Sequence, residues 1–348
     1  MWYTIVGCAA KGSSQIQLVH GGKTVFKRKM LLIGISLLLL VGLVGGVGVQ
    51  AQGGETGSED DPWLQKPVLS YLLLTEDERL EREAQALFEA LRLSEKEERA
   101  MQQIAAEEQQ QVQALYQESQ EAIQDKSRSS SEKQEAAHKH NERVTESMVK
   151  TDQAVRQLLG SRYSAFRVWI RGWWQRERQA IVKLKQPQGG AGTRSDAYSC
   201  WVFATQYNGY TDYEVALPDK YVKFANLGWY IPPPYDARYN NPPYTIHINR
   251  DSYWVWGVLV REVGPWNIDD NYWDAADGSN PRRMFTDIPL CWSEAEYAYY
   301  YGYNGGKDQF GRTVTVPCSV DLTPDVAADL GLGYLENSWL TVYYSDLP

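Results

Sequence analysis

The sequence contains no Lys/Arg-rich stripe. Its 348 residues include 35 Lys and Arg against 44 Asp and Glu, so the formal net charge is −9. Proteins that bind nucleic acid neutralise phosphates with clustered Lys and Arg. The composition therefore argues against a nucleic-acid partner, and we expect none.

Cysteine is scarce as well: Cys8, Cys200, Cys291 and Cys318 are the four in the chain. Cys8 precedes the export segment described below, so an exported chain would keep three, an odd number. One disulfide and one buried thiol are the simplest arrangement of three cysteines. No cysteine comes directly after the apolar run of the export segment, so we expect no lipid attachment there.

The N-terminal 51 residues have the pattern of an export signal. Basic residues 27–29 precede an apolar run over residues 30–49, which leads to small residues at Val49 and Ala51. This pattern predicts a signal peptide that is cleaved after Ala51. The run is near twenty residues, so an uncleaved membrane anchor is the alternative. In either case we expect an extracytoplasmic protein that is secreted or attached to the envelope, and that touches a membrane only through this segment if it stays uncleaved.

Residues 52–69 are polar and predict a linker, and residues 70–186 predict a helical-hairpin domain. Capping-box patterns begin at Thr75 and Ser94, and apolar residues follow each at helical spacing. A polar loop over residues 125–131 separates the second helix from a third, which ends at Gly160. A fourth segment then has an aromatic stripe. Two long helices joined by a polar loop predict an antiparallel pair that either is purely structural or binds a partner or a second copy.

Two short motifs of this helical part resemble periplasmic helical-hairpin proteins of the Spy/CpxP type. They are the LxLSEKE start of the second helix and the LLG-x-x-Y-x-x-F of the return helix. The resemblance implies an envelope scaffold or a stress sensor that acts through residues 70–186. His138 and His140 are separated by one residue, but no thiolate lies nearby, so we expect a solvated pair and no metal.

A Pro/Gly-rich linker over residues 187–196 precedes a β-rich domain over residues 197–348. In the run from residue 253 to 263, apolar residues occupy both alternating sets, which predicts a strand buried on both faces. Helices are expected after Ser293 and after Thr323, where Pro324 takes the first helical position. We therefore expect an α+β protein whose C-terminal part is a compact six-stranded barrel with short helices. The expected strands cover residues 201–206, 221–224, 244–249, 253–263, 312–316 and 339–344.

Several motifs of residues 200–345, taken in order, resemble the double-psi β-barrel of rare lipoprotein A-like domains. They are VLVREVGPWN, DNYWD, YNGGKDQFGR, VDLTPDVAADLGL and SWLTVYY. Gly264 and Pro265 match the family's GP turn, and Asp321 lies in its strand-to-helix motif. Glu262 stands where lytic members of the family have Asp. The resemblance implies a groove that binds cell-wall polysaccharide, and the longer Glu puts cleavage in doubt because a misplacement of about 1 Å can cost about a hundredfold in rate.

Four carboxylates are the candidate catalytic residues: Glu262, Asp269, Asp270 and Asp321. A lytic transglycosylase needs one protonated carboxyl, and a hydrolase needs two. Each also has an ordinary structural interpretation, as a helix-start residue or a solvated loop residue. Asp274 and Asp277 extend this acidic run, but the spacing does not fit an EF-hand, so we expect neither a metal nor a cofactor.

Glycan-binding candidates lie in the loop after the GP turn. Trp266, Tyr272 and Trp273 are expected to stack on sugar rings, with Asp274 accepting from hydroxyls. The alternative is that these rings fill the core. The YAYYYGY run of residues 297–303 adds more rings than a domain of this size usually buries, which indicates an exposed stacking surface.

The resemblance also implies a disulfide, because the family has small residues where this chain has Cys291 and Cys318. Cys200 would then be the free thiol.

These features favour an envelope protein whose barrel binds peptidoglycan or a similar glycan with little or no catalysis. One alternative is a peptidoglycan lytic transglycosylase that uses Glu262 or a loop Asp as general acid and base. The other is the scaffold or stress sensor described above. The sequence leaves the question of catalysis open.

Overall fold

The computed structural model of this protein describes residues 61–185, 199–209, 211–221, 230–233, 244–277 and 281–344. The expected export segment, residues 1–51, the expected second linker, residues 187–196, and residues 222–224 of the strand expected over 221–224 lie outside these ranges. In the part of the chain that the structure describes, no helix is both long enough and apolar enough to span a membrane.

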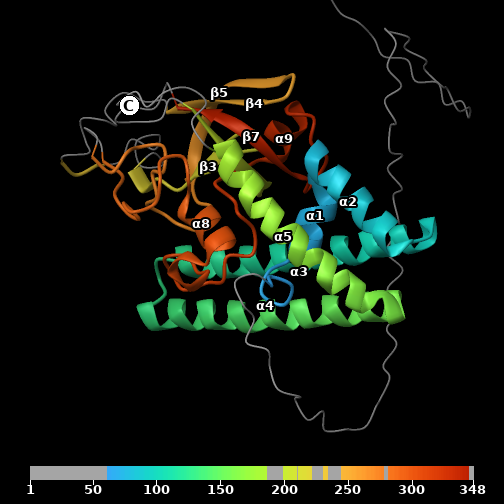
Figure 1. The fold of residues 1–348 in the computed structure, drawn as a ribbon. Helices are drawn as coiled ribbons and strands as arrows, with labels where there is room; N and C mark the ends of the chain where they lie inside the picture. Colours follow the sequence, from blue (N-terminus) through green and yellow to red (C-terminus); the bar gives the residue numbers. More distant parts are fainter. Residues whose placement is uncertain are drawn as a thin grey trace, which may run out of the picture. The chain divides into compact units, whose positions relative to one another are not determined.

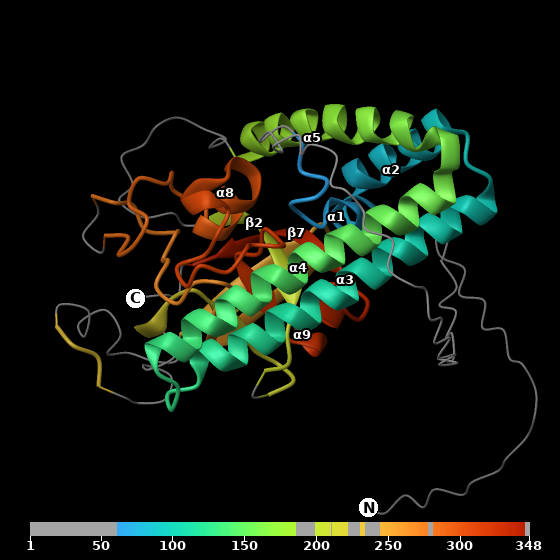
Figure 2. The same ribbon diagram turned by 90° about the horizontal axis from the view of Figure 1, so that it is seen from below.

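The helical part contains a long antiparallel hairpin, in which α3 and α4 lie side by side (Figure 2). Ser94 caps α3 through the predicted capping box, and Ser129 caps α4 in the same way. The other prediction, that Thr75 caps a helix, is wrong: Asp77 caps α2, while Thr75 pairs with Asn337 of the barrel. The elements are α1 (Val68–Leu74), β1 (Thr75–Glu76), α2 (Glu78–Leu91), α3 (Glu95–Gln124), α4 (Ser130–Leu159) and α5 (Tyr163–Lys185).

Six strands form a closed barrel after the helices, which confirms the expected α+β fold (Figure 1). The ring runs β7-β2-β6-β3-β5-β4 and closes through the pairing of β4 with β7. Two neighbouring pairs are parallel, β2 with β6 and β3 with β5. The elements are β2 (Ser199–Gln206), β3 (Val215–Leu217), β4 (Thr245–Arg250), β5 (Tyr253–Val263), α8 (Glu294–Tyr301), β6 (Val320–Leu322), α9 (Pro324–Asp329) and β7 (Asn337–Tyr343).

Four of the expected strands match β2, β4, β5 and β7, and both expected short helices are present. The expected strand over residues 312–316 is wrong, because within it only Thr313 pairs, in an isolated bridge with Lys307. The short strands β3 and β6 were not predicted. Each has only three residues, too few for a period of two to be recognised.

Strand β5 is buried on one face only. Two irregularities in its pairing interrupt the alternation of inward and outward side chains. Val255, Val258 and Val260 belong to the core of the barrel, and Val263 pairs with Leu217 of that core, so the inward residues are spaced by three, two and three. Each spacing of three carries one extra residue relative to the neighbouring strand, as a β-bulge does. Trp254 and Trp256 consequently face outward and are exposed, so the prediction of a strand buried on both faces is wrong.

The helices and the outer surface of the barrel share one hydrophobic core. Trp173 and Trp174 of α5 pack in the same cluster as Phe203 of β2 and Trp339 of β7. Trp63 and helix α1 are buried in this core as well, although Trp63 and the first two residues of α1 lie in the segment expected to be a linker. The YAYYYGY rings join this core: Tyr299 and Tyr300 are fully buried, so the prediction of an exposed surface there is wrong for these two.

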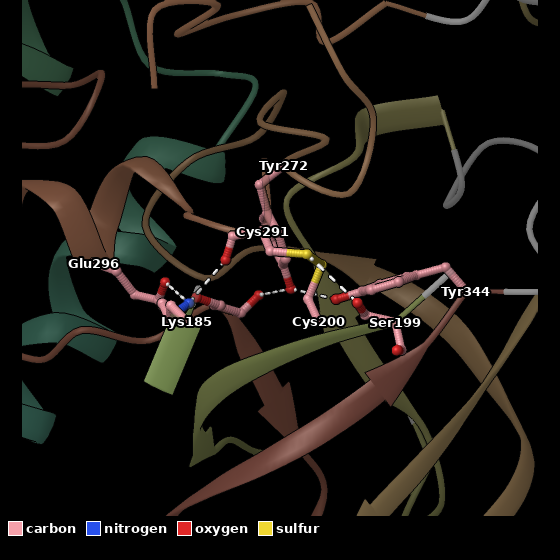
Figure 3. Close-up of a disulfide and its surroundings, with 8 residues drawn as sticks. Lys185, Ser199, Cys200, Tyr272, Cys291, Glu296 and Tyr344 are labelled. Atoms are coloured by element: carbon pink, nitrogen blue, oxygen red, sulfur yellow. Dashed lines mark hydrogen bonds and ion pairs between the residues drawn. A yellow bond between two sulfur atoms is a disulfide. The ribbon is translucent and has the colours of Figure 1, made fainter. Parts of the chain in front are cut away.

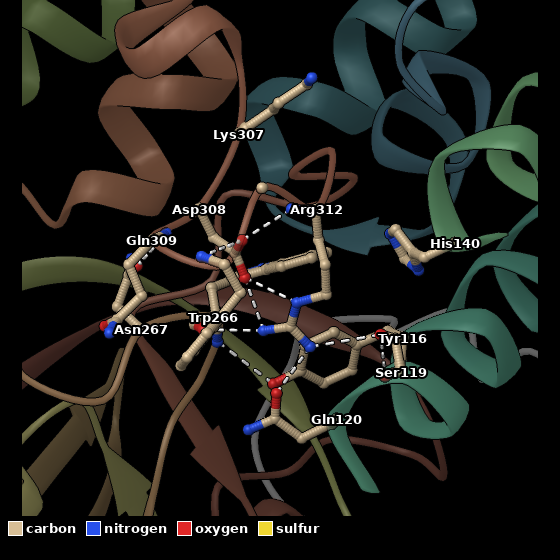
Figure 4. A network of polar contacts seen from close by, with 12 residues as sticks. Tyr116, Ser119, Gln120, His140, Trp266, Asn267, Lys307, Asp308, Gln309 and Arg312 are labelled. Carbon is tan, nitrogen blue, oxygen red and sulfur yellow. Dashed lines mark hydrogen bonds and ion pairs between the residues drawn. The ribbon is translucent and has the colours of Figure 1, made fainter. Parts of the chain in front are cut away.

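A buried arginine ties α3 to the barrel (Figure 4). Arg312 is fully buried and pairs with Asp308 at 2.6 Å. It also donates to Gln120 Oε1 of α3 at 2.7 Å and to the Trp266 carbonyl at 2.7 Å. A buried ion pair of this kind costs several kcal/mol to break, because the remaining charge is left unpaired. The contact therefore specifies where α3 lies on the barrel.

The disulfide joins Cys200 at the start of β2 to Cys291 just before α8 (Figure 3). The predicted Cys291–Cys318 pairing is therefore wrong, and Cys318 is a free, buried thiol. Lys185, the last residue of α5, donates to the Cys291 carbonyl at 2.8 Å and pairs with Glu296 at 2.5 Å, with both side chains buried. The end of the helical part, the start of the barrel and α8 thus meet at one point.

Candidate functional site

Two of the four candidate catalytic carboxylates lie in one row across the outer surface of the barrel. Ala216 of β3 is in register with Asp321 on one side and with Glu262 on the other. Thr205 of β2 continues the row as the partner of Asp321. Side chains of directly paired residues point to the same face of a sheet. Asp321 and Glu262 therefore flank the small Ala216, on the face opposite the barrel interior.

The bulge in β5 is the reason that Glu262 belongs to this row. Val215 pairs with Val260, yet its neighbour Ala216 pairs with Glu262, so β5 has one extra residue here. Without it, Glu262 would share the inward face of Val260 and would have to be buried in the barrel. Bulges commonly re-aim a side chain next to a functional site, and this one moves a carboxylate from the core to the surface.

The row also limits the chemistry of the two carboxylates. Two strand spacings separate the Cα atoms of Asp321 and Glu262, about 9–10 Å. The Asp321 carboxylate accepts from Thr205, on the strand away from Ala216, and Glu262 Oε1 accepts from the Val263 amide of its own strand at 3.1 Å. Neither contact draws the two carboxyl groups toward each other, and the backbone spacing exceeds the roughly 5–5.5 Å between the carboxyl groups of a retaining pair.

Asp321 lies at the floor of the site and is only 3 % exposed. Its carboxylate accepts from the Thr205 hydroxyl, and the Cys318 sulfur lies 3.2 Å from Oδ1. Burial raises the pKa of Asp321, and hydrogen bonds from Thr205, Cys318 and the Tyr116 hydroxyl offset part of that rise. Burial also raises the pKa of the Cys318 thiol well above its ordinary value, which keeps it unreactive. Asp321 thus retains a proton at higher pH than an exposed Asp.

A cleft of about 180 Å³ lies above this row, between the barrel and α3. The barrel side includes Glu262, Asp321, Tyr207 and Asn208. Burial and the nearby negative charges, with Glu214 the largest of these, raise the pKa of Tyr207, so its phenol stays protonated. The opposite wall is one face of α3, with side chains of Tyr116, Gln117, Gln120, Glu121 and Gln124. The cleft thus offers amides, phenols and carboxylates to a polar ligand.

Helix α3 is held over the row by glutamine side chains. Gln109, Gln113 and Gln124 donate to barrel carbonyls of Leu335, Gln206 and Val263, at 2.6, 3.1 and 3.2 Å respectively. Spacings of 4 and 11 residues place these three amides on one face of a helix. The contact between α3 and the cleft rim is therefore largely polar, in contrast to the apolar core under α5.

The predicted glycan-stacking loop is part of the core. Trp266, Tyr272, Trp273 and Asp274 are each at most 1 % exposed. The Trp266 indole donates to the carbonyl of Val316 at 3.0 Å, and the Tyr272 and Trp273 rings pack edge to face at 5.0 Å. Because these rings have no accessible face, the prediction that they stack on a ligand is wrong. The alternative, a core role, is confirmed.

The remaining two catalytic candidates are engaged in ion pairs. Asp270 is fully buried, pairs with Arg282 and accepts from the Glu294 amide at 2.6 Å. Asp269 pairs with Arg283 at 2.5 Å and with Lys220 at 2.6 Å. Both carboxylates hold the loop in place rather than face the cleft, so their candidacy for catalysis is not supported by their position.

The histidines of the HKH run point into different surroundings. His138 is exposed, 3.5 Å from Glu142, while His140 is buried between the carbonyls of Leu115 and Thr313, both at 3.2 Å. Within the described ranges, no group of three or more His, Cys, Asp or Glu side chains is placed to hold a metal ion.

Tyr116 and Tyr207 of the cleft, and Thr205, which donates to Asp321, were not named from the sequence. Thr205 and Tyr207 lie at the end of a strand that was predicted, but nothing local indicates that they face a carboxylate on another strand. Tyr116 had a signal, because it lies among glutamines that recur at helical spacing in α3. In the structure, three amides of this face donate to barrel carbonyls.

Residues 198–343, nearly the whole barrel region, match the model of a family described as Domain of unknown function (DUF8814). Comparison with curated proteins and with solved structures gives no match.

Proposed function

We propose that this is an exported bacterial envelope protein whose barrel, of the rare lipoprotein A-like double-psi type, binds cell-wall polysaccharide in the cleft under α3. One observation carries the proposal: the row that places Asp321 and Glu262 on either side of Ala216. Carboxylates accept hydrogen bonds from sugar hydroxyls, and the amides and phenols around them supply further donors and acceptors.

Two further features support this assignment. The motifs that resemble the rare lipoprotein A-like barrel include the turn at Gly264 and the strand carrying Asp321, and both line the cleft. The disulfide between Cys200 and Cys291 fits a protein that folds in an oxidising compartment. It therefore supports the export expected from residues 1–51.

The test is binding of the purified protein to insoluble peptidoglycan. A hydrogen bond to a charged group contributes about 1.5–3 kcal/mol, so we expect Glu262→Gln to weaken binding about ten- to a hundredfold. The matched control is Asp325→Asn, which removes an exposed carboxylate of α9 away from the cleft. Absence of binding by the unaltered protein would refute the proposal and favour a scaffold or stress sensor that acts through the helical hairpin.

A second candidate function is cleavage of the glycan, and the raised pKa of Asp321 favours it. A carboxyl that keeps its proton to higher pH than an exposed Asp can donate that proton to the glycosidic oxygen as the bond to the anomeric carbon breaks. In a lytic transglycosylase the same carboxylate then takes the proton of the sugar hydroxyl that closes the anhydro ring, which restores the acid without water.

Mass spectrometry of soluble products separates binding from cleavage. If the protein is a lytic enzyme, incubation with peptidoglycan releases anhydro-muropeptides, and Asp321→Asn abolishes their release while binding is retained. If no such product forms and Glu262→Gln lowers binding, the cleft binds without cleaving.

A further inference from the structure

Two tryptophans stand on the outside of the barrel, away from the cleft. Trp254 and Trp256 of β5 are 41 % and 66 % exposed, although Trp is among the side chains with most apolar area to bury. Their rings stack on each other at 4.7 Å with 9° between the planes. Tyr343 of β7 packs beside Trp254 at 5.3 Å, and His247 of β4 packs beside Trp256 at 5.0 Å. We call these four residues the aromatic ridge.

The ridge is produced by the first bulge in β5. Ile248 pairs with Val255 and Ile246 with Val258. Between these pairs β5 has two residues, Trp256 and Gly257, where β4 has one. Gly257 has a φ of +65°, a conformation that favours glycine. Its amide donates to His247 Nδ1 at 2.8 Å, so the imidazole of the ridge is oriented by the backbone and carries its proton on Nε2. The ring order is therefore built into the strand.

Polar side chains lie beside the rings. Tyr343 is the pairing partner of His247, and Thr341 is the partner of Asn249, which in turn pairs with Trp254. The same outer face of β7, β4 and β5 thus presents a hydroxyl, an amide and an imidazole next to two indoles. Aromatic rings stack on the apolar face of a sugar ring, while uncharged polar groups exchange hydrogen bonds with its hydroxyls.

We infer that the aromatic ridge is a second carbohydrate-binding surface. It binds a neutral stretch of a polysaccharide, and another part of the same polysaccharide enters the cleft. The inference rests on the proposed glycan binding. Ridge and cleft lie on one strand: Trp256 and Glu262 are six residues apart, about 20 Å in an extended strand. The hairpin of β4 and β5 lies on the side of the barrel away from α3 and α4 (Figure 1). A ligand that reaches both sites must be a chain of several sugars.

Indole rings are also typical of membrane-interface contacts, so the chemistry around them decides between the two. A membrane anchor needs an apolar surface that enters the lipid, with cations placed for the headgroups. Here Asn249 and Thr341 lie in the same row as Trp254, so the surface beside the indoles is polar rather than continuously apolar. The nearby Arg250 is turned toward the protein, to Ser338 Oγ and the Leu330 carbonyl, both at 3.0 Å. These features favour a sugar.

The test compares the double variant Trp254→Ala/Trp256→Ala with Tyr334→Ala, which removes a ring that is 67 % exposed elsewhere. Probes are insoluble peptidoglycan and soluble chitohexaose, a neutral hexasaccharide of N-acetylglucosamine. We expect the double variant to lose at least tenfold in affinity for both, and Tyr334→Ala to bind normally. Trp256→Phe, which keeps a ring, should retain most of the affinity. Thermal unfolding should change little, since the removed rings are largely exposed.

The outcomes distinguish this inference from the cleft proposal. Binding that is lost in Glu262→Gln but unchanged in the double variant overturns the ridge and leaves the cleft. The opposite pattern supports the ridge and overturns the cleft. Absence of binding to either glycan overturns both. Ridge-dependent binding to phosphatidylcholine vesicles, with no ridge-dependent binding to glycan, would assign the surface to a membrane and refute the inference.

Discussion

Removal of the disulfide between Cys200 and Cys291 should destabilise this protein strongly. The bond closes a loop with a sequence separation of 91 residues. In the chain-entropy model, a cross-link over a loop of this length restricts the unfolded chain by about 4.6 kcal/mol at 25 °C. Native disulfides typically contribute about 2–5 kcal/mol. We therefore expect the double variant Cys200→Ser/Cys291→Ser to lose about 3–5 kcal/mol of unfolding free energy.

Urea unfolding followed by tryptophan fluorescence measures this loss, with and without reductant. The unaltered protein should be destabilised by reductant, and the double variant should be insensitive to it. The control is Cys318→Ala: it removes a buried thiol but no cross-link, so it should keep the full effect of reductant. A loss below about 1 kcal/mol in the double variant would contradict the entropic argument. A Cys318→Ala protein that no longer responds to reductant would contradict the pairing itself.

Three further perturbations test the buried polar groups and the contact of α3. Burial raises the pKa of Glu294 to about 8. Since the pKa in the unfolded chain is near 4.5, the protonated carboxyl stabilises the fold in acid, and this stabilisation is lost as pH rises toward 8. Between pH 5 and 8.5, Glu294→Gln should therefore reduce the fall in unfolding free energy, measured in urea, by up to about 4 kcal/mol; an unchanged dependence on pH would refute this. Arg312→Met leaves Asp308 buried without its cation and should cost about 3–5 kcal/mol in urea unfolding; a cost below 1 kcal/mol would disprove the anchoring role. Gln113→Ala removes one hydrogen bond between α3 and the barrel, worth about 1 kcal/mol, and should speed labelling of Cys318 by a thiol reagent about fivefold in peptide mass spectrometry; an equal rate would mean that this hydrogen bond does not limit access to Cys318.

Local patterns in the sequence predicted most of the elements. The capping box at Ser94 and the glycine at residue 160 mark helix ends that the structure confirms. The alternation of residues 253–263 matches the bounds of β5. These features depend on neighbours within a few residues, so the sequence displays them directly.

The faces of β5 were not predictable in the same way. A bulge is defined by the partner strand, and β5 has different partners at its two irregularities, β4 near Gly257 and β3 near Glu262. Gly257 is the one local hint of the first bulge, and nothing in the local sequence of β5 marks the second. Hence Trp256 was assigned to a buried strand, and the row that unites Glu262 with Asp321 was not foreseen, although both residues were named.

The burial of the aromatic loop and the pairing of the cysteines were likewise decided in three dimensions. Trp266 and Trp273 lie in a segment whose composition fits a ligand surface as well as a core, and only the packing around them distinguishes the two. Cys291 is closer in sequence to Cys318, yet the packing of α8 against the start of β2 brings it to Cys200.

The sequence by itself thus determined that the chain forms helices followed by a barrel, and it named the carboxylates that were candidates for the site. The tertiary structure decided which of them meet, which rings remain accessible and that a glutamine face of α3 covers the cleft. The physical reason is that periodicity and capping are local properties, whereas burial, register and disulfide pairing depend on residues that are tens to hundreds of positions apart.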